Sequence, residues 1–398
     1  MTDETKHSIY TRLSHKGRAG THVHGFVNPP VHRGSTVLVE TMQQRRDNAA
    51  KAPTERVMTY GLGGSETHWA LEDVVADIEG GTRCKIVPSG LAACTVPLLA
   101  YLGSGDHVLV PDSVYGPVRS FCDTMLKRMG VETTYYDPCI TQADIAPLFR
   151  PNTKVLYTES PGSHTFEVQD VPGLAEVAHA RGAKVLMDNT WGIFHFQPFT
   201  KGVDVSMQAL TKYVGGHSDI LLGSITVNTA EDWAAIRASN GQLGMFASPD
   251  DCWLALRGVR TMAVRMERQE KSALEVAAWM RNRPEVKEVL HPALPGARGH
   301  DIWKRDFTGA CSLFGVVFQP GFAPERIDAV AEALQLFGMG ASWGGFESLA
   351  LPSGTMPRTA GTGDFGGPMM RLHVGLEAPA DLIADLDQAM RKLHANEE

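Results

Sequence analysis

Residues 185–191 read VLMDNTW and residues 209–219 read ALTKYVGGHSD, and each stretch sets a charged residue after an apolar run. Asp188 closes the first run, and Lys212 follows the second. Short apolar runs of this kind are typical of buried strands in a parallel sheet. Ligands of such sheets bind beyond the carboxyl ends of the strands. We therefore expect both charged side chains at one site.

A carboxylate and a lysine at two strand ends suit the chemistry of pyridoxal 5′-phosphate (PLP). The lysine amine condenses with the cofactor aldehyde, and the carboxylate keeps the pyridinium nitrogen protonated so that the ring accepts electrons. A structural ion pair between Asp188 and Lys212 is the alternative, and it is the commoner one for an isolated pair. The surrounding sequence has to decide between the two.

The composition is that of an ordinary soluble globular protein of two or three domains, with 398 residues, 43% hydrophobic and 21% charged. The formal net charge of -8 argues against a nucleic-acid partner, because such proteins normally present a basic face. No apolar run approaches the length that spans a bilayer, so no membrane partner is expected.

Residues 1–18 are polar and lack the apolar stretch of a secretory signal. His22 and His24 have no cysteine or carboxylate cluster nearby, which favours a turn of the arm over a metal site. The cysteines lie apart without a CxxC pair, so we expect buried thiols in the cytoplasm and no metal. They are Cys84, Cys94, Cys122, Cys139, Cys252 and Cys311.

The pattern along the chain predicts an arm and two domains. Residues 1–60 are polar and rich in turns, and are interpreted as an arm that contacts a neighbouring subunit. Residues 61–255 alternate apolar runs with helical patterns, which predicts a mostly parallel sheet covered on both faces and hence an α/β fold. A long helix over about 250–281 leads into a smaller α+β domain, residues 256–398. Strands are expected at 85–87, 107–110, 155–158, 185–187, 205–210, 312–319 and 370–374.

Three further features fit a cofactor site. The stretch VPSGL (87–91) runs from a strand into a helix start, where free N–H groups and the dipole favour a phosphate. Tyr115, in the turn after a strand, is placed to lay its ring on a pyridine face. Arg371 lies among apolar neighbours and suits a substrate carboxylate. Each feature is weak alone, because helix caps, packing tyrosines and structural ion pairs are commoner.

Blocks of sequence in a fixed order carry a family resemblance. They are YGLGGSETHWALE (60–72), GDHVLVPDSVYGP (105–117), ESPGSHTFEVQDVP (159–172), DNTW (188–191), TKYVGGHSD (211–219), HPALPGARGHDIWKRDFTGACSLF (291–314) and SWGGFESL (342–349). The chain resembles the Cys/Met-metabolism family of PLP-dependent enzymes over nearly its whole length. The last two blocks are most similar to the β-lyases of that family, because γ-lyases and synthases more often carry leucine at Trp343.

The resemblance implies a role for each matching residue. Lys212 would bond covalently to PLP and act in catalysis, Asp188 would hold the pyridinium nitrogen, and Tyr115 would stack on the ring as a second catalytic candidate. Phosphate contacts are implied for Gly90, Leu91, Thr211 and, from the neighbouring subunit, Tyr60. Contacts to the substrate carboxylate are implied for Ser342, Trp343 and Arg371. The family fold is PLP fold type I, with active sites at a dimer interface, usually in a homotetramer made of two dimers.

Three departures from the family pattern bear on the site. Leu62 stands where the family carries an arginine that binds the phosphate, and Ala209 stands where a serine is common. Ala341 replaces a larger tyrosine and opens the substrate pocket. We expect weaker PLP binding unless a cation of the arm takes the place of the arginine. The candidates are Arg45, Arg46 and Arg56.

The resemblance implies cleavage of L-cystathionine, an amino-acid thioether, to homocysteine, pyruvate and ammonia. Ala341 keeps open a broader cysteine-S-conjugate β-lyase, and a γ-lyase or γ-synthase of the same family is the other enzymatic alternative. Leu62 keeps open a protein that binds PLP without lyase activity. The retention of Lys212 and Arg371 argues against that last alternative, because a pure binder has no use for a substrate arginine.

Overall fold

The computed structural model describes residues 7–18, 25–354, 357–361 and 365–394, so the pair His22 and His24 lies outside the described residues. Its larger sheet has seven strands in the order β1-β7-β6-β5-β4-β2-β3. β7 runs antiparallel to both neighbours and the other strands are parallel, so the predicted mostly parallel sheet is confirmed. The strands are β1 (Arg83–Val87), β2 (His107–Pro111), β3 (Glu132–Tyr136), β4 (Thr153–Glu159), β5 (Lys184–Asp188), β6 (Val205–Gln208) and β7 (Gly223–Val227).

Helices cover both faces of this sheet, because successive strand residues point to opposite sides. Val185 and Met187 belong to one buried cluster and Leu186 belongs to another. The first cluster is completed by α3 (Glu66–Glu79), α7 (Val171–His179) and α9 (Pro249–Val259). The second is completed by α4 (Gly90–Tyr101), α5 (Gly116–Phe121) and α8 (Ala230–Gln242). Both faces of β5 are therefore dry, and only its carboxyl end is open to ligands.

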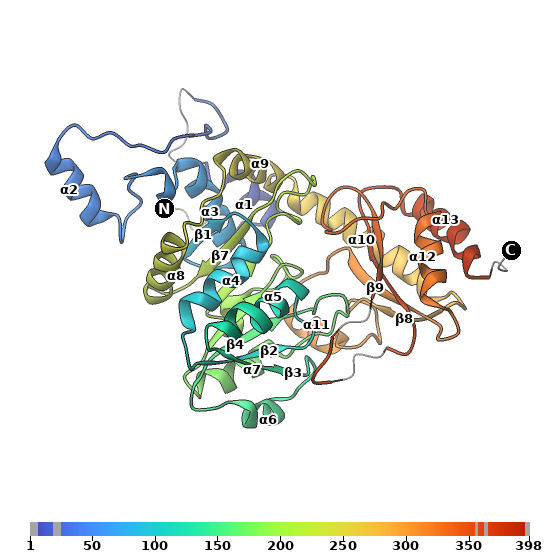
Figure 1. Ribbon diagram of the computed structural model, residues 1–398. Helices are drawn as coiled ribbons and strands as arrows, with labels where there is room; N and C mark the ends of the chain where they lie inside the picture. The colour runs from blue at the N-terminus through green and yellow to red at the C-terminus, as the bar shows by residue number, and fades with distance from the viewer. Residues whose placement is uncertain (1–6, 19–24, 355–356, 362–364, 395–398) are drawn as a thin grey trace.

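The C-terminal part forms a separate antiparallel sheet in the order β10-β11-β9-β8, packed beside the larger domain (Figure 1). Its strands are β8 (Val286–Leu290), β9 (Leu313–Phe318), β10 (Leu349–Ser353) and β11 (Met369–His373). Its helices include α10 (Met262–Arg281), α12 (Pro324–Ala333), α13 (Pro379–Met390) and the short η6 (Arg391–His394). These elements share one apolar cluster of their own. The break between the two sheets falls between β7 and β8, and a domain boundary near residue 255 within that span stays a prediction.

The expectation of one long helix over 250–281 is wrong. The structure has two helices, α9 and α10, separated at Arg260 and Thr261. Arg265 donates from Nη2 to the carbonyl of Gly258 at 2.9 Å and to the carbonyl of Tyr213 at 2.8 Å. Because a side chain takes the Gly258 carbonyl, the end of α9 is held against the turn after Lys212 instead of continuing straight.

Part of the N-terminal arm packs on its own chain, since Leu13 is buried and the Trp253 indole donates to the Pro29 carbonyl at 3.0 Å, whereas the segment around α2 is exposed. α2 (Met42–Lys51) has no buried residue and projects from the body at the far end from the C-terminal domain (Figure 1). Leu38 is 88% exposed and Phe26 is 72% exposed. Such apolar exposure is typical of a surface covered by a partner, although contact with a neighbouring subunit stays a prediction.

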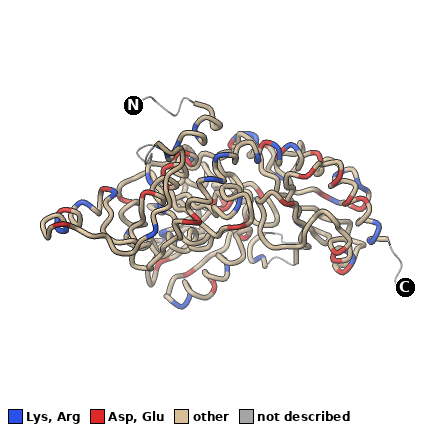
Figure 2. The backbone as a smooth tube through the Cα atoms, turned by 90° about the horizontal axis from the view of Figure 1, so that it is seen from above, with Lys and Arg blue, Asp and Glu red and all other residues tan. Residues whose placement is uncertain are grey.

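The remaining short elements connect the main ones. They are α1 (Ile9–His15), η2 (Gly61–Gly63), η3 (Cys122–Leu126), α6 (Gln142–Ile145), η4 (Ala146–Leu148), η5 (Pro198–Lys201) and α11 (His300–Asp306). Basic and acidic positions are interspersed along the backbone in the view of Figure 2. Within the described parts of the chain, no helix has both the length and the apolar character needed to cross a membrane.

Candidate active site

Asp188 and Lys212 lie at the carboxyl ends of adjacent strands, as the sequence predicts. Asp188 is the last residue of β5 and pairs in register with Met207 of β6. Lys212 follows the end of β6 by four residues, in a turn. Thr190 joins the two segments, because its Oγ1 donates to Asp188 Oδ1 at 2.6 Å and accepts from the Ala209 amide at 2.9 Å.

The Asp188 carboxylate is removed from water and has neutral hydrogen-bond donors. The amide of Thr190 donates to Oδ1 at 3.0 Å, and Cys94 Sγ lies 3.5 Å from Oδ2. Burial raises the pKa of Asp188, and the Thr190 hydrogen bonds oppose that shift. Within the described residues, no lysine or arginine forms an ion pair with Asp188. A desolvated carboxylate of this kind is complementary to a ligand N–H that carries positive charge.

The Lys212 amine has a lowered pKa. Its Nζ donates to Ser342 Oγ at 2.6 Å and lies 5.3 Å from the centre of the Trp343 ring. Burial, reinforced by the positive charge of Arg371, lowers the pKa of Lys212 to about 8, and Asp188 opposes the shift. In the part of the chain that the structure describes, no carboxylate pairs with Lys212. A lysine that loses its proton this readily is suited to act as a nucleophile and a base.

Ser342 lies between Lys212 and Arg371. Its hydroxyl accepts from Lys212, and its carbonyl accepts from Arg371 Nη2 at 3.0 Å. Ser342 has a φ of 83°, a left-handed conformation that costs a non-glycine residue about 1–3 kcal/mol and is typical of functional sites. The three residues implied to bind a substrate carboxylate, Ser342, Trp343 and Arg371, are therefore gathered around the lysine.

Gly344 allows this loop to touch the lysine backbone. A Cβ on Gly344 would lie 2.9 Å from Lys212 Cβ and 3.0 Å from Lys212 Cα, and the φ of Gly344 is 85°. Its amide donates to His373 Nε2 at 3.1 Å, and His373 Nδ1 lies 3.0 Å from Ser312 Oγ. The buried His373 of β11 thus anchors the loop that positions Ser342.

Tyr115 lies at the start of α5, on the same side as Asp188. Its amide donates to Glu159 Oε2 at 2.7 Å, and Glu159 pairs in register with Asp188 across β4 and β5. Burial, reinforced by the charge of the Asp188 carboxylate, raises the pKa of Tyr115. The side chain is 41% exposed. A neutral, half-open phenol ring beside Asp188 is compatible with stacking on a ligand ring.

The start of α4 lies against the turn that carries Lys212. Ser89 Oγ accepts from the Ala92 amide at 3.1 Å, and a Cβ on Gly90 would lie 2.6 Å from Ala209 Cβ. The positive end of the α4 dipole therefore faces the lysine turn, where a phosphate would be stabilised. Leu91 is 38% exposed at the same helix start. The Thr211 hydroxyl accepts from the Leu222 amide at 3.1 Å and donates to the Leu222 carbonyl at 3.2 Å, so donation to a phosphate would have to replace that second bond.

Tyr60 lies away from this cluster within its own chain. It bridges to Thr36 in the arm, is 56% exposed and lines a surface pocket of about 470 Å³ together with Leu62. Arg56 lines the same pocket, and its Nη2 lies 2.7 Å from Asp73 and 3.7 Å from Glu72. Arg56 is thus already engaged by carboxylates, which weakens it as a replacement for the missing phosphate arginine.

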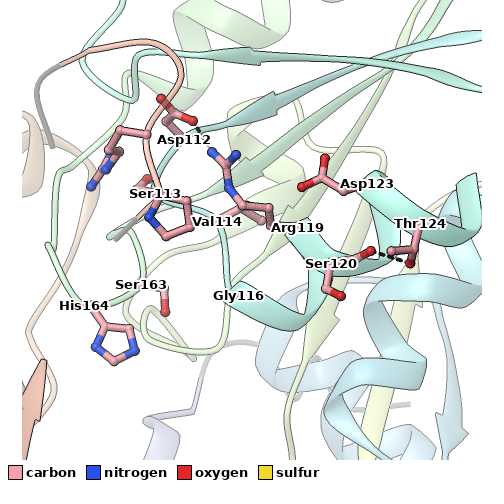
Figure 3. Close-up of a pocket in the computed structure, with 12 residues that line it drawn as sticks. Asp112, Ser113, Val114, Gly116, Arg119, Ser120, Asp123, Thr124, Ser163 and His164 are labelled. Carbon is pink, nitrogen blue, oxygen red and sulfur yellow. Dashed lines mark hydrogen bonds and ion pairs between the residues drawn. The ribbon is translucent and has the colours of Figure 1, made fainter. Parts of the chain in front are cut away.

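A second pocket, of about 360 Å³, opens beside α5. Val114 and Gly116, which flank Tyr115, line it, whereas Lys212 and Arg371 do not. Figure 3 shows Arg119 pointing toward Asp112, with which it forms an ion pair, and His164 on the facing loop. This pocket therefore adjoins the Tyr115 turn without containing the lysine.

The residues present fit PLP. A desolvated carboxylate would face the ring nitrogen, an amine of lowered pKa would reach the aldehyde, and the start of α4 would face the phosphate. Among the described residues no group of three His, Cys, Asp or Glu side chains gathers as a metal site would require. Because Asp188 and Lys212 do not pair with each other, the alternative of a plain structural ion pair fails.

Sequence reasoning missed several residues of this region. Glu159 and Cys94 contact the segments around Asp188, His373 anchors the Ser342 loop, and Glu79 lies behind Asp188. The signal for Glu79 was present, because Leu71, Val75 and Glu79 follow the spacing of one helix face, which placed a carboxylate on a buried stripe. The sequence gives no such signal for His373. A histidine that only packs in the core would fit the same alternation of side chains along β11.

Comparisons with known proteins agree with this site. The family described as Cys/Met metabolism PLP-dependent enzyme matches residues 10–391. The cystathionine beta-lyase of Bordetella avium is 43% identical over 397 residues, and the match covers 98% of this chain and 99% of that protein. An L-alanine/L-glutamate racemase of Wolbachia pipientis is 37% identical, with 95% of each chain covered. The crystal structure of metB from Corynebacterium glutamicum superposes with a TM-score of 0.88 at 29% identity, covering 98% of this chain and 100% of that one. The chain therefore belongs to the Cys/Met-metabolism family of PLP-dependent enzymes, and its cofactor is pyridoxal 5′-phosphate.

Proposed function

We propose that this protein is a carbon–sulfur β-lyase that cleaves L-cystathionine, with water, to homocysteine, pyruvate and ammonia. The observation that carries the proposal is the contact of Lys212 with Ser342, whose carbonyl in turn binds Arg371. This arrangement places a base beside the group suited to a substrate α-carboxylate. The family relationship and the relative from Bordetella avium support the substrate.

Each residue has a separate part in the proposed reaction. Arg371 binds the α-carboxylate of the amino acid through its guanidinium, which fixes the α-carbon beside Lys212. When bound, PLP supplies an electron sink for the negative charge that develops at that carbon. Lys212, freed as a neutral amine, removes the α-proton at its Nζ. Loss of the β-thiolate follows, and hydrolysis of the remaining fragment yields pyruvate and ammonia.

The range of thioethers that the proposed enzyme accepts depends on the small side chain of Ala341. Ala341 adjoins Ser342 where a larger residue is common in the β-lyases, so the proposal extends to other cysteine thioethers. A γ-lyase would yield 2-oxobutyrate instead of pyruvate, and the relative from Wolbachia pipientis makes racemisation the second candidate. All of these reactions begin with removal of the α-proton, so only the products separate them.

The test is a panel of L-cystathionine, S-methyl-L-cysteine, L-alanine and L-glutamate incubated with the PLP-loaded protein. We expect pyruvate, ammonia and a free thiol from cystathionine. Formation of 2-oxobutyrate would identify a γ-lyase, and D-amino acids without a keto acid would identify a racemase. Bound PLP with no product from any of these compounds would favour the non-catalytic alternative.

We infer a cytoplasmic homo-oligomer, built as a dimer of dimers. The exposed apolar residues of the arm and the exposed Tyr60 support contact with a second copy, which would bring Tyr60 to that copy's phosphate site. The free cysteines support a reducing compartment. Light scattering of the full chain and of a chain that lacks the arm tests the assembly. Identical masses for both proteins would contradict the role of the arm.

A further inference from the structure

Glu79 is the last residue of α3, and its carboxylate has no exposed surface. Ser206 Oγ donates to its Oε2, and Gln208 Nε2 donates to its Oε1 at 2.7 Å. Asn189 Nδ2 lies 3.3 Å from Oε1 and 3.4 Å from Oε2. One carboxylate therefore binds side chains from the ends of two different strands.

Those two strands carry the residues of the reaction. Asn189 directly follows Asp188 at the end of β5, whereas Gln208 ends β6 four residues before Lys212. Gln208 Nε2 also donates to the carbonyl of Asn189 at 2.9 Å, which closes a small ring of hydrogen bonds with Glu79. The two strand ends are already paired through the backbone, since the Asn189 amide donates to the Met207 carbonyl at 2.9 Å, and the Glu79 carboxylate adds a side-chain brace across the same pair.

The chemistry of Glu79 is unusual for a residue that only fills space. Burial raises its pKa to about 7, against the lowering effect of its three hydrogen-bond donors. All of these donors are neutral, and within the described residues no lysine or arginine pairs with Glu79. Burying a carboxylate without a cationic partner carries a desolvation penalty, and an apolar side chain in the same place would avoid it. The gain from this residue is therefore expected in geometry, not in stability.

We propose that Glu79 is a positioning residue: by bracing Asn189 after β5 and Gln208 at the end of β6, it fixes where Asp188 lies relative to Lys212. The inference rests on the proposed roles of those two residues. Orientation of reacting groups is sensitive, since a displacement of about 1 Å costs on the order of a hundredfold in rate. Glu79 acts through its neighbours and touches neither substrate nor cofactor.

Glu79→Gln and Ser206→Ala, both in the PLP-loaded protein, test the proposal. Glu79→Gln keeps the size of the side chain but places an NH₂ group among donors, and Ser206→Ala removes one donor. Asp385→Asn is the matched control: Asp385 is 5% exposed, and it accepts from the Gln335 amide at 2.9 Å and the Leu336 amide at 2.7 Å, in the C-terminal domain. The measurements are kcat and KM for cystathionine, the melting temperature, and the pH midpoint of the bound cofactor's absorbance.

We expect Glu79→Gln to lower kcat by about tenfold to a hundredfold with KM changed by less than about threefold. The absorbance midpoint should fall, because Asp188, whose charge raises the pKa of Lys212, is no longer held in its place relative to that amine. Ser206→Ala should move both quantities the same way by less. Asp385→Asn should lower the melting temperature with neither change. Wild-type kcat and midpoint in Glu79→Gln, or equal shifts in Asp385→Asn, would overturn the proposal. Should the wild type lack β-lyase activity, the absorbance midpoint still decides the role of Glu79.

Discussion

The Nζ atom of Lys212 donates a hydrogen bond to the Oγ atom of Ser342 at 2.6 Å, across 130 positions of sequence. The carbonyl of the same serine accepts from Arg371 at 3.0 Å. Ser342 thereby holds a lysine of the large domain and an arginine of the small sheet on its two polar groups. The amine and the proposed carboxylate site are consequently connected through one residue.

Lys212→Ala should abolish covalent attachment of the cofactor. The wild-type protein is expected to be yellow, and borohydride should leave PLP bound to Lys212, as read by mass spectrometry of peptides. Loss of the base should lower activity by at least about a hundredfold. Lys271→Ala is the control, because that side chain is 71% exposed and only pairs with Glu267. A cofactor adduct on a different lysine would refute the assignment.

The rate at which cofactor-free protein captures PLP should rise with pH through a midpoint near pH 8. The neutral amine is the nucleophile, and burial together with Arg371 lowers the pKa of Lys212 to about 8. Below that pH the rate should fall about tenfold per pH unit, as the amine becomes protonated. Arg371→Gln removes a positive charge and should shift the midpoint upward. Stopped-flow absorbance gives the profile, and a wild-type midpoint near 10 would show that Lys212 is not perturbed.

Arg371→Ala should raise the KM for cystathionine far more than it alters cofactor content. A charged hydrogen-bonded pair contributes about 1.5–3 kcal/mol, which corresponds to roughly tenfold to a hundredfold in KM. Arg371→Lys keeps the charge but loses the planar fork, so an intermediate value is expected. Steady-state kinetics and the PLP content by absorbance check the result. An unchanged KM in the alanine variant would place the substrate carboxylate elsewhere.

Leu62→Arg should tighten PLP binding if the phosphate lacks a cation. The structure has Arg56 committed to Asp73 and Glu72, and α2, which carries the other two candidates Arg45 and Arg46, projects from the body. The measurement is PLP dissociation at increasing salt, since an added charge pair should weaken with ionic strength. Leu62→Gln serves as the uncharged control. Equal or weaker binding in Leu62→Arg would mean that another group already fills the position.

Gly344→Ala should impair the lysine without removing any chemical group. A methyl group there would approach Lys212 Cβ to 2.9 Å, and the left-handed backbone adds a cost of about 1–2 kcal/mol. We expect a lower kcat and a lower melting temperature. Gly340→Ala is the control, because its nearest contact is Leu349 Cδ2 at an ordinary 3.8 Å. Equal effects from both variants would contradict a specific contact with Lys212.

Local patterns in the sequence were enough to predict the parallel sheet and the place of Asp188. Apolar runs mark buried strands because both faces of such a sheet are dry, and Asp188 is the residue at which β5 leaves that environment. The family blocks identified Lys212, Tyr115 and Ser342 as candidates, and Arg371 was singled out by its apolar neighbours. The same patterns overextended the helix at 250–281, since the turn between α9 and α10 depends on a side chain, Arg265, that reaches back to Gly258.

The sequence by itself determined which residues end strands and which helix faces are apolar, because these properties depend on neighbours within one or two turns, and its ordered blocks determined which family the chain resembles. Only the tertiary structure decided that Ser342 meets Lys212, that His373 anchors the intervening loop and that Glu79 binds both Asn189 and Gln208. Those contacts follow from the order of strands in the sheet and from the packing of the second domain against it. The free energy that selects them is summed over the whole core, and no short stretch of sequence contains it.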